Sequence, residues 1–274
     1  MSRADIFRIV DVLADTNNRT ELVEVVERDA EEADVDEQVT VWQSTTHSPE
    51  MVVRVHEPLI SLELINLPAT LDARLVMLRE PASEKARTYR LLRHRLLSRG
   101  DPRVIAVTSA RPGDGKTTCA VNLALAIAED TMMRVLLMDT NLRRPGLGRM
   151  FGFEPDESLV SNLARFVDVR PPYPVVGICG TRVHVAALPE VADFSSRLER
   201  TLFSVALAEL RTEYDYIVVD AGSVLESADA DVLGECADGV VVAARAGTSK
   251  KADLRRAIDQ LRPAAVLGTV LLDA

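Results

Sequence analysis

The chain has 274 residues, 47% of them hydrophobic and only 4% aromatic, a balance that allows an α/β core of Val, Leu, Ala and Ile. The formal charge of -10 argues against a general nucleic-acid binder, because phosphate contacts require a basic surface, and three dispersed cysteines indicate neither a disulfide framework nor a zinc site. No apolar run is long enough for a membrane-spanning helix and no signal-peptide core is visible, so we expect a cytoplasmic protein that meets the inner membrane only through a partner.

The N-terminal region carries alternating apolar and acidic residues. Residues 1–40 predict one or two surface helices that end in an acidic run from Glu31 to Glu37. β-favouring pieces at 39–42 and 51–55, with prolines nearby, favour equally a small appended module and an extended linker. We therefore predict an N-terminal extension or small regulatory module over residues 1–80, to which the sequence assigns no role.

A second domain is predicted over residues 81–274. Ser83 is a candidate N-cap for a basic amphipathic helix in which Arg87, Arg90 and Arg93 recur at every third position. Beyond it, apolar strands are predicted at 104–108, 134–138, 183–188, 216–219, 239–244 and 266–272, and helices at 116–129, 195–211 and 251–261. Val, Leu and Ile runs separated by helical lengths are typical of a parallel sheet covered on both faces. The predicted fold class is α/β, with a twisted parallel sheet and helices on both of its faces.

The first of these strands leads into a loop that has the features of a phosphate-binding P-loop. The loop and helix start read Ala110-Arg111-Pro112-Gly113-Asp114-Gly115-Lys116-Thr117-Thr118. Gly113 and Gly115 permit a backbone whose N–H groups converge on phosphate oxygens, at the positive end of a helix. Lys116 can neutralise the β- and γ-phosphates while the Thr117 hydroxyl binds Mg²⁺. Ala110 stands where the usual motif has its first glycine, so the alternative is an accidental glycine-lysine helix start.

Two aspartates follow buried strands. Asp139 ends the run Leu136-Leu137-Met138, and Asp220 ends the run Ile217-Val218-Val219. Ligands bind at the carboxyl ends of the strands in an open parallel sheet, and Mg²⁺ usually binds one or two carboxylates together with substrate phosphates. The alternative is that each aspartate is a helix cap or turn residue. Both together with the P-loop predict a nucleotide–Mg²⁺ site.

These motifs resemble, in order, those of bacterial tyrosine kinases of the CpsD/CapB type, which are linked to capsule and exopolysaccharide synthesis. Residues 108–118 resemble the family's Walker A motif, 138–145 its second aspartate motif, termed A′, and 217–220 its Walker B motif. The stretches at 238–242 and 267–271 continue the similarity in the same order. The Arg-Pro pair at 144–145 separates this family from most other P-loop proteins.

The resemblance implies transfer of the γ-phosphoryl group of ATP to tyrosine, with Mg²⁺ as cofactor. Lys116 would be the charge clamp, Asp139 the base or metal organiser, and Asp220 the metal partner. Thr117, Asp139 and Asp220 would hold the metal. The nucleotide would contact Arg111, Pro112, Gly113, Asp114, Gly115, Lys116, Thr117, Thr118, Arg143 and Asp273. The implied partners are a membrane-embedded polysaccharide co-polymerase that acts as activator and, through an E-x-x-R-x-x-R helix, further copies of the chain.

The sequence departs from the family pattern at several positions. Asn141 replaces the second A′ aspartate, and Gly222-Ser223 replaces a rigid proline turn with one that we expect to be flexible. Asp273 stands where an asparagine commonly approaches adenine, and the chain ends without a tyrosine-rich tail, so tail autophosphorylation is not expected. Counted back from the P-loop, the glutamate of the ring motif falls on Arg87.

These departures keep two alternatives open. One is an ATP-binding regulatory subunit of the same system that does not transfer phosphate. The other is a positioning ATPase of the MinD/ParA class, although Arg111 replaces the signature lysine of that class.

Overall fold

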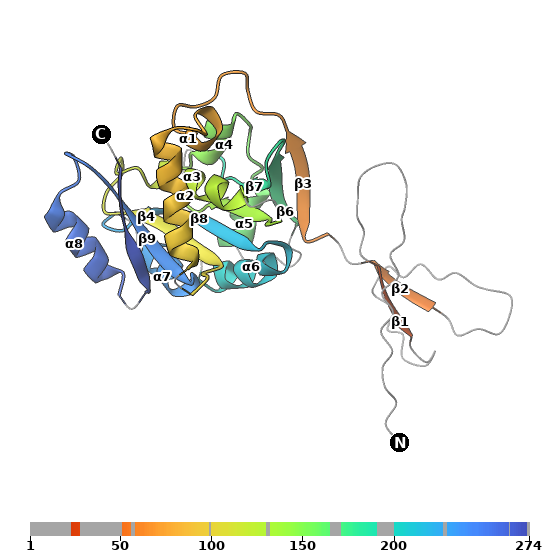
Figure 1. Ribbon diagram of the computed structural model, residues 1–274. Coiled ribbons are helices and arrows are strands. Elements are labelled where there is room, and N and C mark those ends of the chain that lie inside the picture. The colour runs from red at the N-terminus through yellow and green to blue at the C-terminus, as the bar shows by residue number, and fades with distance from the viewer. Residues whose placement is uncertain are drawn as a thin grey trace. The chain divides into compact units, whose positions relative to one another are not determined.

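The computed structural model of the protein describes residues 23–27, 51–55, 58–98, 100–129, 132–164, 171–190, 200–226, 229–262 and 264–272 (Figure 1). It divides the chain into two compact units, Met1–Leu59 and Ile60–Ala274. In the described part of the chain, no helix is long and apolar enough to cross a membrane.

The first unit contains a two-stranded antiparallel sheet. Strand β1 (Val23–Glu27) pairs with β2 (Met51–Val55), with Val25 opposite Val53. The predicted surface helix is therefore wrong over 23–27, because its β-branched valines favour a strand once a valine-rich partner is available. The rest of the helical prediction, and the β-favouring piece at 39–42, lie outside the described residues.

The second unit is built on one eight-stranded sheet in the order β10-β9-β4-β8-β5-β7-β6-β3. All neighbouring strands are parallel except β6 and β7. The strands are β3 (Ile60–Ile65), β4 (Val104–Ser109), β5 (Val135–Asp139), β6 (Tyr173–Ile178), β7 (Val183–Ala186), β8 (Tyr216–Ser223), β9 (Gly239–Arg245) and β10 (Val266–Leu272).

Helices cover both faces of this sheet (Figure 1). They are α1 (Val76–Arg79), α2 (Glu84–Leu97), α3 (Lys116–Ala128), α4 (Leu147–Phe151), α5 (Ser158–Ala164), α6 (Arg200–Glu213), α7 (Asp229–Cys236) and α8 (Lys251–Gln260). On one face of the sheet, Ile105 and Leu137 belong to the core cluster that contains the apolar residues of α3. Successive strand residues point to opposite faces, and the neighbouring Ala106 and Leu136 are buried as well. Both faces of the sheet are therefore covered. The predicted α/β class is confirmed.

Most predicted elements correspond to observed ones. Each strand and helix predicted from residue 104 onward is present, with ends that differ by a few residues, although the start of the helix predicted at 195–211 lies outside the described residues. The Ser83 hydroxyl accepts a hydrogen bond from the Ala86 N–H at 3.2 Å, which confirms the predicted N-cap of α2. Strand β6 and the helices α4, α5 and α7 were not anticipated from the sequence.

The structural division falls between Leu59 and Ile60, earlier than the boundary that the sequence suggested at residue 80. The reason is β3, which pairs in parallel with β6 from Ile60 to Ile65 and so forms an edge of the main sheet. Residues 60–80 therefore belong to the same unit as the P-loop. The role of the preceding residues stays a proposal.

A buried asparagine fastens this segment to α3. The Asn122 side-chain amide donates to the carbonyls of Arg74 at 2.7 Å and Thr118 at 2.8 Å, and its oxygen accepts the Met77 N–H at 3.0 Å. Asn122 is fully buried, so these three backbone groups depend on it alone for those bonds. The first turns of α3 and the α1 segment are thereby held as one block.

Asn122→Ala is expected to lower the free energy of unfolding by about 2–4 kcal/mol, because it leaves buried donors and acceptors without partners. Thermal or urea unfolding monitored by circular dichroism measures this. Thr88→Ala is the control, since the Thr88 hydroxyl bonds the Glu84 carbonyl on an exposed part of α2 and its loss should change stability by less than about 0.5 kcal/mol. Equal losses in the two variants would contradict the special role of Asn122.

Candidate nucleotide-binding site

The loop between β4 and α3 has the backbone shape that the glycine pattern predicted. Gly113 and Gly115 adopt φ angles of 87° and 94°, which lie in the left-handed region that side chains rarely adopt. At Gly115 a Cβ atom would also approach Leu272 Cδ1 to 2.3 Å. The backbone conformation therefore favours glycine at this position, and a larger residue would also displace the Leu272 side chain.

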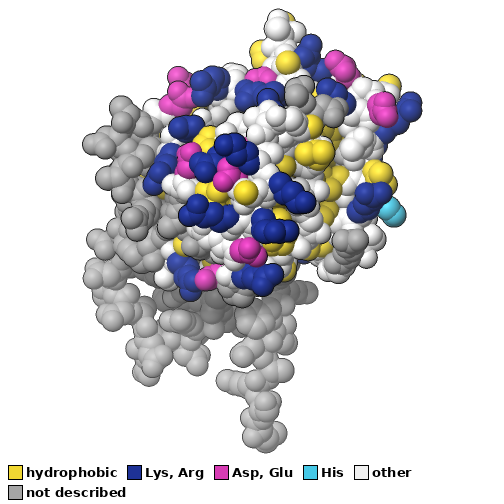
Figure 2. All heavy atoms as spheres, turned by 90° about the vertical axis from the view of Figure 1, so that its left-hand side faces the viewer, with side chains coloured by type: hydrophobic (Ala, Val, Ile, Leu, Met, Phe, Trp, Pro, Cys, Tyr) yellow, Lys and Arg dark blue, Asp and Glu magenta, His cyan; other side chains and the backbone are white. Residues whose placement is uncertain are grey.

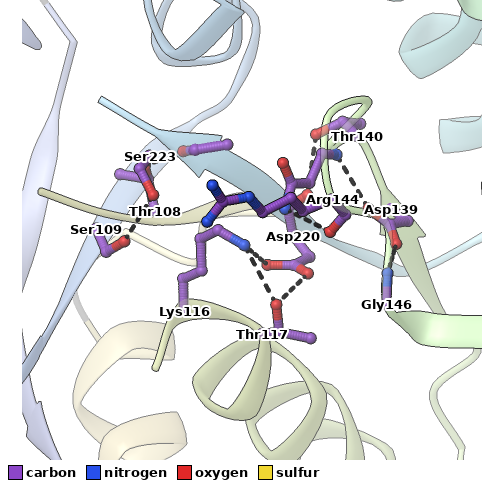
Figure 3. A network of polar contacts seen from close by, with 12 residues as sticks. Thr108, Ser109, Lys116, Thr117, Asp139, Thr140, Arg144, Gly146, Asp220 and Ser223 are labelled. Carbon is purple, nitrogen blue, oxygen red and sulfur yellow. Dashed lines mark hydrogen bonds and ion pairs between the residues drawn. The ribbon is translucent and has the colours of Figure 1, made fainter. Parts of the chain in front are cut away.

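Three side chains converge beyond this loop (Figure 3). The Thr117 hydroxyl donates to Asp220 Oδ2 at 2.7 Å, and Lys116 Nζ lies 3.8 Å from Asp220 Oδ1 and 3.3 Å from Thr117 Oγ1. Lys116 and Thr117 come from the first turn of α3, and Asp220 comes from β8, the strand beside β4. The sheet therefore brings together the predicted charge clamp and two predicted metal ligands.

Asp220 is buried without full compensation. Its side chain is 1% exposed, and Oδ1 accepts no hydrogen bond. Burial raises the pKa of this carboxyl, while Lys116 and the Thr117 hydroxyl act in the opposite direction. A carboxylate oxygen without a hydrogen-bond donor, next to a threonine hydroxyl, has the donor chemistry that Mg²⁺ prefers.

The residues therefore fit a magnesium ion that is held mainly by a nucleotide. Among the described residues no group of three or more His, Cys, Asp or Glu side chains could hold a metal by itself. Magnesium commonly binds one or two carboxylates and takes its remaining ligands from phosphates and water. Asp220 and Thr117 can supply the protein's share of such a site.

Asp139 lies beside Asp220 but is already engaged. The two residues are paired in register between β5 and β8. Asp139 Oδ1 accepts the Asn141 N–H at 3.0 Å, and Oδ2 accepts the N–H groups of Gly146 at 2.9 Å and Leu147 at 3.3 Å. Burial, and secondarily the charge of Asp220, raise the pKa of Asp139, while the amide bonds lower it. Asp139 thus shapes the loop that follows β5, as the turn alternative anticipated, and it remains a candidate metal organiser.

The loop after β5 is closed by Asn141. Its side-chain amide donates to the Arg144 carbonyl at 2.8 Å, so the residue that replaces the second A′ aspartate stabilises a turn. Arg143 and Arg144 are both exposed. In Figure 3 the Arg144 side chain extends from this loop toward the part of the site that contains Lys116, a placement that the sequence analysis did not assign.

Arg111 contributes its backbone to the loop but directs its side chain elsewhere. The guanidinium group forms two hydrogen bonds with Asp253 of α8, at 2.7 and 3.3 Å. Asp114 accepts the Arg111 N–H at 2.8 Å and the Ser249 hydroxyl, so the P-loop is joined to the segment between β9 and α8. No local sequence signal marked Ser249 or Asp253, because both meet the loop only in the folded protein. The predicted nucleotide contact Asp273 lies outside the described residues.

The segment after Asp220 is more ordered than predicted. Strand β8 continues through Ala221 and Gly222 to Ser223, all buried. The Thr108 hydroxyl donates to the Gly222 carbonyl at 2.6 Å, and the hydroxyls of Ser109 and Ser223 are 3.3 Å apart. The expectation of a flexible turn is wrong here, because these side chains of β4 hold the segment in the sheet.

The basic helix α2 uses its arginines within the chain. Arg90 forms two hydrogen bonds with the Glu129 carboxylate, and Arg93 donates to the Ala126 carbonyl at 2.8 Å. Both contacts fasten α2 to the C-terminal end of α3. Glu84 and Arg87 are exposed, so oligomerisation through this helix stays a proposal.

Comparison with known proteins identifies relatives of this arrangement. No protein-family model matches the chain. The succinoglycan biosynthesis transport protein ExoP of Rhizobium meliloti is 31% identical over 202 residues, which are 70% of this chain but only 25% of ExoP. Tyrosine-protein kinase YwqD of Bacillus subtilis is 29% identical over 206 residues, covering 72% of this chain and 83% of YwqD. Among solved structures, the kinase domain of VpsO is 27% identical with a TM-score of 0.57, over 70% of this chain and 98% of that domain.

Proposed function

Because the chain belongs to the CpsD-type family of bacterial tyrosine kinases, we propose that it binds ATP with Mg²⁺ and transfers the γ-phosphoryl group to a tyrosine hydroxyl. The observation that carries the proposal is the cluster of Lys116, Thr117 and Asp220 at the end of the glycine loop, with one carboxylate oxygen free of hydrogen bonds. Such a cluster suits a phosphate–metal pair better than a purely structural role, because a buried carboxylate oxygen that accepts no hydrogen bond costs stability.

The chain's residues divide the work of the transfer. The P-loop amides and Lys116 bind the phosphates and stabilise the negative charge that develops on the transferred group. Bound magnesium would supply charge neutralisation between the β- and γ-phosphates. In the reaction the tyrosine oxygen forms a bond to the γ-phosphorus, the bond to the ADP oxygen breaks, and the phenolic proton leaves to a base.

Asp139 was predicted as that base or as a metal organiser. Its raised pKa suits proton acceptance near neutral pH. Both of its oxygens, however, accept backbone N–H groups, and the side chain is fully buried, which hinders direct contact with a substrate hydroxyl. We favour the organiser role, in which Asp139 shapes the loop beside Asp220.

The names of the relatives suggest where this activity would operate. ExoP is named for succinoglycan biosynthesis and transport. By this similarity the chain would regulate the synthesis or export of an exopolysaccharide or capsule, together with a membrane-embedded activator, and it would act on the cytoplasmic side of the inner membrane.

To test the proposal, the purified chain is incubated with γ-labelled ATP and Mg²⁺. The incubation is repeated with a tyrosine-containing polymer, and again with membranes that hold the candidate activator. Phosphotyrosine detected by mass spectrometry is the expected product. If calorimetry detects no association with ATP or ADP in the presence of magnesium, the proposal fails. Phosphate release without phosphotyrosine would instead favour a positioning ATPase.

One observation favours a second candidate function, an ATP-binding regulator that does not transfer phosphate. Asn141 bonds the Arg144 carbonyl, where a carboxylate would be repelled, so the A′ loop is adapted to the amide. An amide removes a negative charge near the metal and cannot accept a proton.

Asn141→Asp distinguishes the two functions. If the chain is an impaired kinase, the added carboxylate is expected to raise the rate of phosphotyrosine formation by roughly tenfold or more, since positioned acid–base groups contribute about 10²–10⁴ in rate. Single-turnover transfer measures this. Asn141→Ala is the matched control, because it removes the same loop bond without adding charge. Robust transfer by the unmodified chain would eliminate the regulator hypothesis.

A further inference from the structure

Four unpaired positive charges lie on and just before helix α8. Lys250, Lys251, Arg255 and Arg256 are exposed, and none forms an ion pair with another residue in the part of the chain that the structure describes. Figure 2 faces the side of the molecule on which α8 lies, and it shows many Lys and Arg side chains, with fewer Asp and Glu among them, next to exposed apolar ones. We call these four residues the α8 basic cluster.

The acidic residues of the same helix do little to neutralise this cluster. The Asp253 carboxylate accepts a hydrogen bond from the Arg111 guanidinium group. The Asp259 carboxylate forms an ion pair with Arg262 at 3.9 Å, and the side chains of Asp259 and Arg262 are both exposed. Both acids bond to arginines outside the cluster, and the charge of Asp253 also acts on Lys250 and Arg256. The cluster keeps its positive charge on the outer side of α8, where Lys251 and Arg255 are one helical turn apart.

Most of the formal negative charge of the chain belongs to its first unit. Residues 1–59 hold 14 acidic and 5 basic residues, a formal charge of -9, while residues 60–274 have a formal charge of only -1. The second unit is therefore nearly neutral as a whole, and the α8 basic cluster is one local concentration of positive charge on it.

The strand that follows α8 carries an exposed leucine. Strand β10, which follows α8, is the edge strand of the sheet and pairs only with β9. Its Leu271 is 68% exposed. Basic residues next to exposed aliphatic ones are typical of surfaces that lie on a membrane. Residues 250–272 contain no aromatic side chain, which argues against single-stranded nucleic acid, whose bases stack on aromatic rings.

We propose that the α8 basic cluster, together with the exposed Leu271 of β10, docks directly on a membrane surface rich in anionic phospholipids. The positive cluster complements the negative headgroups, and the flexible lysine and arginine side chains can follow a fluid surface. This goes beyond the proposed function, because it gives the chain a membrane contact of its own. Since Asp253 of the same helix holds Arg111 of the P-loop, docking places the nucleotide site close to the membrane.

Flotation of the full chain with lipid vesicles tests the proposal. The experiment is done without nucleotide, so its result does not depend on any kinase activity. Binding is expected to vesicles of phosphatidylcholine with about a third phosphatidylglycerol, and to be weak with phosphatidylcholine alone. One basic residue near an anionic surface strengthens binding roughly fivefold. Replacing all four cluster residues by glutamine should therefore weaken binding by roughly a hundredfold or more, and 1 M salt should release the wild-type chain, since it shortens the Debye length to about 3 Å.

The matched control replaces four other exposed cations, Arg79, Lys85, Arg95 and Arg182, by glutamine. It makes the same change in net charge away from α8 and should retain most of the binding. Circular dichroism and thermal melting confirm that both variants are folded, and Leu271→Ser in a folded chain should weaken binding further. Failure of the wild type to bind anionic vesicles, equal loss in both quadruple variants, or tighter binding to duplex DNA than to vesicles would overturn the proposal.

Discussion

Lys116→Met is expected to abolish phosphoryl transfer and to weaken ATP binding by tenfold or more. Lys116 is the basic residue nearest to Asp220 in the site, with Nζ 3.8 Å from its carboxylate, and its side chain is only 11% exposed. Water therefore cannot replace its charge. Hydrogen bonds from charged donors are stronger than neutral ones, and removing one group that stabilises a developing negative charge commonly costs 10²–10³ in rate.

Isothermal titration with ATP and with ADP, followed by single-turnover transfer, measures the two effects of Lys116→Met separately. Lys85→Met is the matched control, because Lys85 is an exposed lysine near the start of α2, far from the P-loop in sequence and without an ion pair among the described residues. Unchanged ATP affinity together with unchanged transfer in Lys116→Met would contradict the assignment of the loop as a phosphate site. Unchanged affinity with lost transfer would place Lys116 in the transition state alone.

Asp220→Asn is expected to remove the Mg²⁺ dependence of nucleotide binding and to lower transfer by roughly 10²–10³-fold, because the carboxylate is the main protein ligand available to the metal. The same change should stabilise the protein without ligand at alkaline pH. The folded-state pKa of Asp220 is raised by burial above its unfolded value, so the folded chain binds the proton more tightly. Stability from this group is then present at low pH and is lost as the pH rises through the folded pKa.

Asparagine carries no charge, so Asp220→Asn does not lose this stability as the pH rises. The variant should therefore melt at a higher temperature than the wild type at pH 8, and the difference in melting temperature should shrink toward pH 4. Melting curves with and without Mg²⁺-ATP measure both effects in one experiment. Asp215→Asn is the control, since Asp215 precedes the other end of the same strand and accepts the Arg134 N–H at 2.7 Å. A wild-type chain that is more stable than Asp220→Asn at pH 8 without ligand would show that the buried charge is compensated.

The location and shape of the phosphate loop were readable from the sequence because they depend on neighbours in the chain. Gly113, Gly115 and Lys116 stand at fixed offsets between a buried strand and a helix, and the positive φ angles of both glycines follow from that local arrangement. The same holds for Asp220, which follows the apolar run 217–219 in the C-terminal half of an interior strand, and ligands bind at the carboxyl ends of the strands in an open parallel sheet. Local pattern and local geometry agree at these positions.

Contacts between distant segments were not readable in this way. Residues 60–65 were read as part of a small appended module or an extended linker, and their identity as β3 depends on hydrogen bonds to β6. Residues 23–27 became a strand because β2 offers a partner, although their acidic alternation suggested a helix. Ser223 was assigned to a flexible turn, yet β4 holds it in the sheet.

The sequence by itself determined the α/β class, the P-loop and the two strand-end aspartates, because each is encoded by spacing within a short stretch. Only the tertiary structure decided how those groups are used. It engages Asp139 with three backbone amides, leaves one oxygen of Asp220 free, and turns Arg111 away toward Asp253. The physical reason is that a charged side chain takes the partner that the fold places within hydrogen-bond reach, and that partner can lie anywhere in the chain.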